Sequence, residues 1–339
     1  MLGPPGGLRR RTLHSRVAPE SKTPGRLRLG LCCQFTEQPI KFRTTTATAL
    51  ARLDRTAQLT KLAELILANA LALKAAVQCC HDLGIGCFRV NSQILPARTH
   101  PTVGYRIDEL PDADALIGAF KQAGELARGY GIRLTFHPDQ FVVLNSPKAD
   151  VVDRSLAELE YQAEVAGWIG ADVINIHAGG AYGDKPAALA LLRQNLERLS
   201  TAARERLTLE NDDRVFAPAD LLPVCRTERI PLVYDVHHHR CLADGLSVEE
   251  ATEQAVSTWS REPLFHISSP LAGWHGPQPQ RHHDYIDLAD WPANWDTLAL
   301  TVEVEAKAKE LAVSRLKREL TGRGVALGMA PRAVARRVE

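Results

Sequence analysis

Short runs of β-branched and aliphatic residues alternate along the chain with longer segments whose apolar residues recur at helical spacing. Runs of this kind are typical of buried strands. Eight are present, at residues 27–32, 87–92, 133–138, 173–179, 207–212, 232–238, 264–269 and 300–307. The segments between them predict helices, and three of these segments end in a glycine, Gly84, Gly131 or Gly170, as α-helices commonly do.

This alternation predicts a parallel TIM (β/α)8 barrel built as a single domain. A doubly wound open sheet is the alternative, and it is disfavoured because no Gly-x-Gly-x-x-Gly motif follows the first predicted strand. We expect the barrel to occupy residues 26–322. A flexible basic arm is expected at 1–25, and a similar C-terminal tail at 323–339.

Composition narrows the class of protein. The net charge of the 339 residues is +1, so DNA binding would have to come from a local patch rather than from the whole chain. No stretch reaches the roughly 18 uninterrupted apolar residues of a membrane helix. The longest apolar region, 62–77, includes Glu64, Asn69 and Lys74 and is expected to be a buried helix. Seven cysteines without a Cys-x-x-Cys pair suggest free thiols in a reducing cytosol. We therefore expect a cytoplasmic protein, monomeric and without a membrane partner.

Polar residues stand at or just beyond the carboxyl ends of most predicted strands, or in the loops that follow them. They are His100, His137, His177, Glu210, Asp235, His237, His266, His282 and Glu305. In a parallel barrel these ends meet at one mouth. Imidazoles and carboxylates crowded together are costly unless cations accompany them, and nitrogen and oxygen ligands suit zinc, manganese or iron(II). Because nine donors exceed the needs of one ion, the sequence predicts two or three.

Each of these residues also has a simpler interpretation. A single histidine at a strand end is more often hydrogen-bonded than metal-bound, and Glu305 could form a surface ion pair with a nearby lysine. Repetition at seven of eight strands favours the metal site. Strand periodicity predicts that Asp235 and His237 point into the mouth and that His238 points away. His239 and Arg240 are expected to begin a loop over the site.

Several stretches resemble the UV damage endonuclease family, which is related to endonuclease IV and to xylose isomerase-like barrels. They are "FRVNSQILPARTHP", "LTFHPDQF", "GADVINIHAGGAYGDK", "LTLENDDR", "PLVYDVHHH", "LFHISSP", "HHDYID" and "VEAKAKE", spread over residues 27–320. The resemblance implies a TIM barrel with a trinuclear cluster, usually of Mn²⁺, with Zn²⁺ or Mg²⁺ as alternatives. It also implies incision of duplex DNA immediately 5′ to pyrimidine dimers and 6-4 photoproducts, leaving a 3′-hydroxyl and a 5′-phosphate.

The resemblance assigns roles to particular residues. It implies the same nine metal ligands, with His282 preferred to His283 by its distance from the Asp-Tyr pair that follows. Glu210 is expected to bridge two ions, and the residues with a catalytic role are Glu210, His237 and Lys185. Residues expected to contact DNA are Gln140, Phe141, Tyr182 and Lys185. The first two would probe the lesion, whereas Lys185 and the Gly-Gly-Ala-Tyr-Gly loop would hold phosphates. The alternatives are a core position for Phe141 and a solvated Lys185.

The sequence departs from the family pattern at three positions. Leu31 and Phe35 replace polar or aromatic probing residues in the first strand–helix loop. Leu264 replaces a lysine found two residues before the strand-seven histidine. Lesion preference and metal count are therefore expected to differ from the family pattern.

Three rival functions remain open from the sequence. They are a metal-dependent sugar isomerase, an abasic-site endonuclease, and a damage-binding protein without activity. The histidine-rich donor set favours phosphate-ester cleavage over sugar isomerisation, which needs mostly carboxylate ligands and a substrate-binding lysine. The complete donor set argues against an inactive binding protein.

Overall fold

The structure is a computed structural model, which describes residue 3 and residues 27–328. Apart from residue 3, the arm predicted at 1–25 lies outside the described residues, as does the predicted tail from residue 329 onward. The last helix, α10 (Glu310–Gly322), ends at the predicted barrel boundary. The chain then returns to the start of the first strand, where Leu327 pairs with Leu27 in a parallel bridge.

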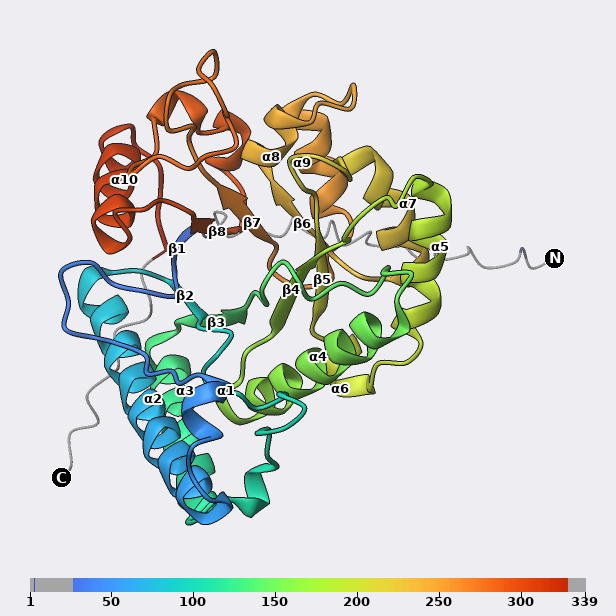
Figure 1. Ribbon diagram of the computed structural model, residues 1–339. Coiled ribbons are helices and arrows are strands. Elements are labelled where there is room, and N and C mark those ends of the chain that lie inside the picture. Colours follow the sequence, from blue (N-terminus) through green and yellow to red (C-terminus); the bar gives the residue numbers. More distant parts are fainter. Residues whose placement is uncertain (1–2, 4–26, 329–339) are drawn as a thin grey trace.

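Eight parallel strands close into a barrel in which each strand pairs with its neighbours in sequence and β8 pairs with β1 (Figure 1). The strands are β1 (Arg28–Cys32), β2 (Cys87–Val90), β3 (Arg133–Phe136), β4 (Val173–His177), β5 (Leu207–Glu210), β6 (Leu232–Asp235), β7 (Leu264–Ile267) and β8 (Thr301–Val304). This closed order confirms the TIM barrel predicted from the alternation of strand and helix patterns.

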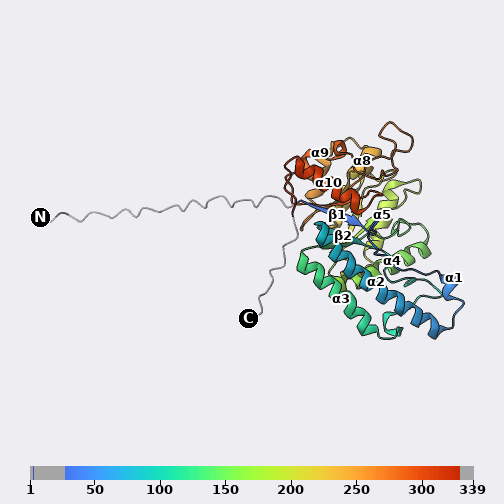
Figure 2. The ribbon, with the colours of Figure 1, turned by 90° about the vertical axis from the view of Figure 1, so that its left-hand side faces the viewer.

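Helices surround the barrel, and Figure 2 shows the short α1 beyond the end toward which β1 points. They are α1 (Ala47–Leu50), α2 (Arg55–Leu83), α3 (Ala113–Tyr130), α4 (Ala149–Ile169), α5 (Lys185–Leu196), α6 (Thr201–Arg204), α7 (Pro218–Glu228), α8 (Val236–Cys241), α9 (Val248–Val256) and α10 (Glu310–Gly322), with 3-10 turns η1 (Ile107–Glu109), η2 (Leu288–Asp290) and η3 (Ala293–Trp295). The predicted C-terminal glycines of α2, α3 and α4 cap these helices with φ angles of 66°, 66° and 76°. An L side chain would be strained at such angles.

Helix α2 is the one helix of the described chain that is long and apolar enough to cross a membrane by length and composition. Nearly half of its most apolar stretch is buried, and one face packs against α3 and β2 through residues such as Leu73 and Val77. Leu67 and Leu71 lie exposed on the other face. The helix predicted over the apolar region 62–77 is therefore present, but only one of its faces is buried.

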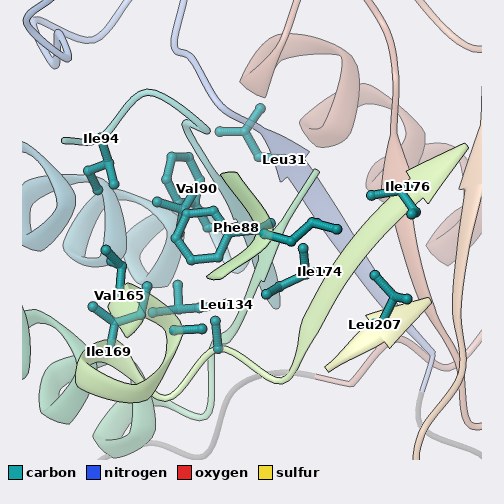
Figure 3. Close-up of a cluster of buried hydrophobic side chains, with 14 of the residues drawn as sticks. Leu31, Phe88, Val90, Ile94, Leu134, Val165, Ile169, Ile174, Ile176 and Leu207 are labelled. Carbon is teal, nitrogen blue, oxygen red and sulfur yellow. The ribbon is translucent and has the colours of Figure 1, made fainter. Parts of the chain in front are cut away.

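The main hydrophobic core fills the space between the barrel and its helices. Figure 3 shows a part of it, where Phe88 and Val90 of β2 and Ile174 of β4 lie near Val165 and Ile169 of α4. These side chains point outward from the strands. The burial of apolar surface in this layer holds the strands in register and so fixes the positions of the residues at their ends.

The side chains inside the barrel change from apolar to polar along the barrel axis. At the amino-terminal end of the strands, Val173, Val233 and Leu264 form a small apolar cluster with Trp259 packed against it. Toward the carboxyl end, the inward positions carry buried polar side chains instead. They include Arg89, Thr135, Asn175, Thr208, Glu210, Asp235, His266 and Glu303. The barrel interior is thus polar toward the mouth and closed by apolar residues below.

All seven cysteines are free, as predicted. Cys32, Cys80, Cys87 and Cys225 are buried, and the other three are partly buried. Burial raises the pKa of the Cys225 thiol to about 12. These thiols are neutral near pH 7, and they act as small packing residues.

Candidate metal centre

Inward-pointing side chains at the carboxyl ends of the strands converge at the mouth of the barrel. They form three overlapping groups, in each of which the ligand atoms all lie within 4.8 Å of one another. The groups are His137–Glu210–His266, Glu210–Asp235–His238 and Asp235–His266–Glu305. Since each group shares members with the others, the six residues form one continuous site, which we call the mouth cluster.

Glu210 lies at the centre of the mouth cluster and is fully buried. Its carboxylate oxygens lie 2.9 Å from Nε2 of His137, 3.1 Å from Nδ1 of His266 and 3.4 Å from Nδ1 of His238. The amide of Asn175 donates a hydrogen bond to the same carboxylate. Burial alone would favour the neutral acid, but the surrounding histidines hold the pKa of Glu210 well below its usual value. Glu210 is therefore an anion with imidazoles near both carboxylate oxygens, and it would hold a divalent cation together with them.

The region after β6 corrects the sequence prediction. Strand β6 ends at Asp235, and α8 begins at the next residue because the Asp235 side chain accepts the backbone N–H of His238 at 2.8 Å as an N-cap. His238 thereby returns to the side of Asp235, with its Nδ1 3.6 Å from the carboxylate. The prediction that His238 points away from the mouth is wrong, because strand alternation stops where the strand stops.

His237 lies beside the mouth cluster rather than within its three groups. Its ring centroid is 5.3 Å from that of His282 and 5.2 Å from that of Trp274. The side chain is fully buried, and neither ring nitrogen has a hydrogen-bond partner among the described residues. Burial lowers the pKa of His237, so the ring is neutral and keeps a free lone pair.

His239 and Arg240 do not form a loop over the site, contrary to the prediction. His239 is buried between the Tyr234 hydroxyl at 2.7 Å and Asp244 at 2.9 Å. Arg240 donates to the carbonyl oxygen of Asp290 at 2.8 Å. Both residues belong to α8, and helical geometry turns them away from the mouth.

His266 reaches the mouth cluster from β7 with one ring nitrogen and a deeper polar layer with the other. Its Nδ1 lies 3.5 Å from Glu305, in addition to the contact with Glu210. Its Nε2 lies 3.2 Å from the carboxylate of Glu303 and 2.9 Å from the guanidinium of Arg89. Burial disfavours the charged ring, but the neighbouring carboxylates raise the pKa of His266 to about 10 in the metal-free protein.

His177 and His282 border the mouth cluster. The ring of His177 is centred 5.3 Å from that of His137, and its Nδ1 is buried without a partner among the described residues. His282 places Nδ1 3.8 Å from Glu305. His283 turns the other way, with its Nδ1 accepting the N–H of Tyr285 at 3.0 Å. The predicted preference for His282 is consistent with this geometry.

His100 is the predicted ligand that the structure does not bring to the others. It lies in the loop between β2 and η1, and its Nδ1 accepts the backbone N–H of Thr102 at 3.2 Å. Its side chain lines a cavity of about 990 Å³ together with Gln140, Phe141 and Tyr182. Among the contacts of residues 27–328, none joins His100 to the mouth cluster. Its role as a ligand remains a prediction.

The donor set fits divalent cations. Glu210, Asp235 and Glu305 place three carboxylates within contact of several imidazoles, and one oxygen of Asp235 is buried without a hydrogen-bond partner in the described chain. The unpartnered nitrogens of His177 and His237 lie around the same mouth. Buried polar atoms are rarely left unpaired, so these atoms are oriented for ligands that the protein itself does not supply. Mixed nitrogen and oxygen donors suit Zn²⁺ or Mn²⁺.

The residues predicted to probe a lesion project from the mouth. Phe141 is 76% exposed, which excludes the alternative that it is a core residue. Gln140, beside it in the β3–α4 loop, lines the 990 Å³ cavity and also a second cleft of about 660 Å³ that reaches His238. Tyr182 is 55% exposed and lines the first cavity. Phe141 and Tyr182 are two exposed aromatic side chains lining the same cavity, and such side chains are suited to stacking on flat rings.

The Gly-Gly-Ala-Tyr-Gly loop after β4 is tightly held. Gly179 has a φ of 90°, and a Cβ at this position would lie 2.1 Å from Oδ1 of Asn145. The amide of Asn145 donates to the carbonyl oxygen of Gly180 at 2.7 Å. Beyond this loop, Lys185 begins α5 and pairs with Asp220 at 2.8 Å. Lys185 is therefore an ion-pair partner of α7 rather than a fully solvated lysine, and its role toward phosphate remains a prediction.

All three residues that depart from the family pattern pack against other parts of the protein. Leu31 is fully buried, and Phe35 stacks on Phe88 with ring centroids 5.8 Å apart. Neither side chain projects from the mouth. Leu264 is buried in the apolar cluster at the base of the barrel.

Sequence reasoning missed three residues of this region as functional candidates. His238 was hidden by the assumption of a longer strand. Arg89 and Glu303 lie one layer below the mouth cluster, and the available signal was their inward position, one residue before the end of β2 and of β8. A charged residue at an inward position of a barrel strand indicates a buried ion pair.

Comparison with known proteins agrees with the geometry. The family description "UV-endonuclease UvdE" matches residues 27–334. The chain belongs to this family. As a member of the UvdE family it is a DNA repair endonuclease for UV damage, and DNA is its substrate. The mouth cluster lies at the carboxyl face of the barrel, where barrel enzymes carry out their chemistry.

Two relatives illustrate the similarity. A UV DNA damage endonuclease of Bacillus velezensis is 35% identical over 256 residues, which cover 71% of this chain and 77% of that protein. A UV-damage endonuclease of Neurospora crassa is 35% identical over 276 residues, covering 75% of this chain but 40% of the fungal protein. This chain is thus similar to most of the bacterial enzyme and to a part of the fungal one.

Solved structures show the same fold. The crystal structure of SacUVDE superposes with a TM-score of 0.78 at 26% identity, covering 88% of this chain and all of that one. Endonuclease IV from Thermus thermophilus gives a TM-score of 0.56 at 14% identity, covering 87% of this chain and 99% of that one. A D-psicose 3-epimerase from Clostridium cellulolyticum gives 0.52 at 13%, covering 89% of this chain and all of that one. The last two likenesses show the fold alone, so activity has to be argued from the site.

Proposed function

We propose that the protein nicks duplex DNA immediately 5′ to UV photoproducts, by hydrolysis at two or three divalent ions, leaving a 3′-hydroxyl and a 5′-phosphate. The observation that carries this proposal is the buried anion Glu210, contacted by His137, His238 and His266 inside a chain of the UvdE family. Phosphodiester hydrolysis requires that charge on the phosphate be neutralised, and this donor set is built to hold the cations that do so.

The ligands fall into an inner and an outer set. The inner set is the mouth cluster, His137, Glu210, Asp235, His238, His266 and Glu305. The outer set is His100, His177, His237 and His282, which supply further nitrogen donors around it. We propose Mn²⁺ as the resident ion, with Zn²⁺ and Mg²⁺ as alternatives to be tested. Bound divalent ions would activate water, neutralise the scissile phosphate and stabilise the leaving oxygen.

The side chains around the centre orient the reaction. Glu210 is held in place by Asn175, and Asp235 by the N-terminus of α8, so that both carboxylates are fixed before substrate binds. Such preorganisation lowers the reorganisation needed in the transition state. We assign catalytic roles to Glu210 and to the histidines His237 and His238. Lys185, which is tied to Asp220, acts in this proposal by shaping the phosphate-binding loop and its helix N-terminus.

Lesion recognition is assigned to the exposed residues of the β3–α4 loop and the β4–α5 loop. A photodimer stacks and pairs poorly, so it is cheaper to displace from the duplex than normal bases. We assign Gln140 and Phe141 to enter the gap, and Tyr182 to offer a second flat surface; the support is that all three line the cavity of about 990 Å³ and that Phe141 and Tyr182 are exposed. Because Leu31 and Phe35 are packed inward, the first strand–helix loop does not contribute a matching probe.

The proposal extends to the cellular setting. Damaged double-stranded DNA is the partner, and we propose a monomer that acts in the cytoplasm, at the nucleoid. We also propose that residues 26–322 form the catalytic domain and that the terminal arms are not needed for chemistry. A truncated protein lacking residues 1–25 would retain incision in this view, and its elution volume on size exclusion would be that of a monomer.

The decisive experiment compares three duplexes that differ only at one position: a cyclobutane dimer, an abasic site and undamaged DNA. Protein loaded with Mn²⁺ is expected to cut the first duplex immediately 5′ to the dimer and to leave the third intact. Glu210→Gln, which preserves shape but removes the charge, should abolish incision. Cutting of the abasic duplex alone would instead identify an abasic-site endonuclease, and turnover of sugars without any nicking would identify an isomerase.

A further inference from the structure

A buried ionic layer lies directly beneath the mouth cluster. Glu303 of β8, 1% exposed, forms an ion pair with Arg89 of β2, whose Nε lies 2.5 Å from its carboxylate. Its other oxygen accepts the hydroxyl of Thr135 on β3. Gly30 on β1 leaves space for this arrangement, because a Cβ there would lie 3.1 Å from Cγ of Glu303. Four adjacent strands are thus arranged around one carboxylate.

This layer touches a predicted metal ligand from behind. Nδ1 of His266 faces Glu210 and Glu305 in the mouth cluster, whereas Nε2 faces Glu303 at 3.2 Å and Arg89 at 2.9 Å. The ring is fully buried, so its orientation is set by these contacts and not by water. Below the layer the barrel is closed by the apolar cluster around Leu264, which offers no polar partner.

The two nitrogens of His266 have opposite requirements. A nitrogen that binds a cation must present a lone pair, so the proton of a neutral imidazole then has to sit on the other nitrogen. Glu303 can accept that proton's hydrogen bond, whereas Arg89 can only donate. With Nδ1 toward the cations, the Nε2–H group points to Glu303.

Arg89 links this layer to a second ligand. Its Nη1 lies 2.6 Å from Glu305, while the rest of the guanidinium pairs with Glu303. Glu305 directly follows β8 and is two residues from Glu303, and its backbone N–H still donates to Ile267 of β7 at 2.9 Å, so both side chains lie on the inner face. Arg89 therefore fixes the distance between Glu305 in the mouth cluster and the carboxylate behind His266.

We propose that Glu303 is a positioning residue that selects the Nδ1-coordinating form of His266, with Arg89 and Thr135 holding its carboxylate in place. The proposal rests on the mouth cluster being the metal centre of the proposed function. A carboxylate–histidine–metal arrangement of this kind orients the ring and raises its basicity as a ligand. Glu303 itself contacts neither substrate nor the predicted ions.

The test measures metal binding directly, without DNA. Glu303→Gln keeps the shape of the side chain and removes its charge. The Mn²⁺ dissociation constant, measured by calorimetry on the full chain, is expected to rise about 10- to 100-fold. The visible absorption spectrum of the Co²⁺-loaded protein is expected to change, since it reports the ligands and their geometry. Unchanged affinity and an unchanged spectrum would overturn the proposal.

The chain contains a matched control. Glu262 also pairs with an arginine and a threonine, through Arg28 at 2.6 Å and Thr301 at 2.5 Å, but at the opposite end of the barrel. Glu262→Gln should lower stability less than Glu303→Gln, because its side chain is 23% exposed, and should leave Mn²⁺ affinity and the Co²⁺ spectrum unchanged. An equal loss of affinity in both variants would show a general effect of barrel charge and would also refute the role of Glu303.

A second variant covers the case in which Glu303→Gln does not fold. Thr135→Val removes the hydroxyl that holds Glu303 and leaves every charge in place. A several-fold weaker Mn²⁺ affinity is expected, and wild-type affinity would contradict the proposal.

The incision assay separates the role of Glu303 from the proposed function. Normal metal binding that depends on Glu303, without cutting of dimer-containing DNA, would refute only the proposed function. Cutting that persists with undiminished metal affinity in Glu303→Gln would refute only the role of Glu303.

Discussion

Asp235 caps the backbone N–H of His238 at 2.8 Å with one carboxylate oxygen, and its other oxygen lies 3.6 Å from the imidazole of the same histidine. One aspartate therefore ends β6, begins α8 and brings a histidine to the mouth cluster. The same contact moves His237 to the edge of the site, beside Trp274.

This relationship predicts different costs for neighbouring histidines. His238→Ala should weaken Mn²⁺ binding at least about tenfold more than His237→Ala, because His238 contacts two carboxylates of the cluster. Calorimetric titration of both variants checks this. His239→Ala is the control: it should lower stability and leave metal affinity unchanged, since His239 is bonded to Tyr234 and Asp244. A larger loss of Mn²⁺ affinity with His237→Ala than with His238→Ala would show that His237 belongs to the inner ligand set.

Removal of metal should destabilise the folded protein. The mouth cluster holds three carboxylates at close range, and bound cations relieve their repulsion. Dialysis against a chelator is expected to lower the thermal midpoint, and Mn²⁺ at 100 times its dissociation constant should restore about 2.7 kcal/mol. Differential scanning calorimetry measures the shift. The double variant Glu210→Gln, Asp235→Asn should show no response to Mn²⁺; a full response there would place the ions elsewhere.

Phe141, the exposed residue assigned to probe the lesion, should affect lesion recognition and not stability. Phe141→Ala removes a side chain that is 76% exposed, so stability should change by less than about 0.5 kcal/mol. Cleavage of the dimer-containing duplex should fall roughly tenfold, which is the scale of one lost stacking contact. Incision kinetics and Mn²⁺ titration together test this. Leu71→Ala, at an exposed apolar residue of α2, is the matched control and should leave incision unchanged.

Asn69 should be required for stability. Its buried amide donates to the carbonyl oxygens of Arg43 at 2.9 Å and Ile94 at 2.8 Å, and accepts the N–H of Arg43 at 2.6 Å. Asn69→Ala leaves these backbone groups unpaired and should cost about 3 kcal/mol. Urea unfolding measures the change, with Lys74→Ala on the exposed side of the same helix as control. A cost below about 1 kcal/mol would mean that water replaces the amide.

The buried thiol of Cys225 should be unreactive at ordinary pH. Burial raises its pKa to about 12, so the neutral thiol persists as pH rises and the reactive thiolate forms only near that value. In the folded protein, iodoacetamide labelling at Cys225, followed by mass spectrometry, should therefore keep increasing from pH 8 to 10. In the urea-unfolded chain it should level off once pH passes the ordinary thiol pKa of about 8.5. A plateau near that value in the folded protein would contradict the burial argument.

Much of the fold and of the candidate site could be predicted because both depend on local patterns. Alternating strand and helix periods indicate a parallel barrel, and a barrel brings all strand ends to one mouth. His137, Glu210, Asp235, His266 and Glu305 could therefore be grouped without knowing any distance. Glycines such as Gly84 marked helix ends because their positive φ is a local requirement.

Tertiary structure decided what local patterns leave open. Whether the chain after Asp235 continued as a strand or turned into a helix depended on an N-cap, and this selected His238 over His237 as the residue facing Glu210. The ion pair of Glu303 with Arg89 joins residues more than 200 positions apart, so no sequence period reveals it. The placement of Phe141 outside and Phe35 inside depended on which loops cover the core. The sequence alone determined which strand ends meet at the mouth, because strand order in a parallel barrel places them in one layer. Only packing between distant strands decided which way each ring turns, because that depends on buried partners from other parts of the chain.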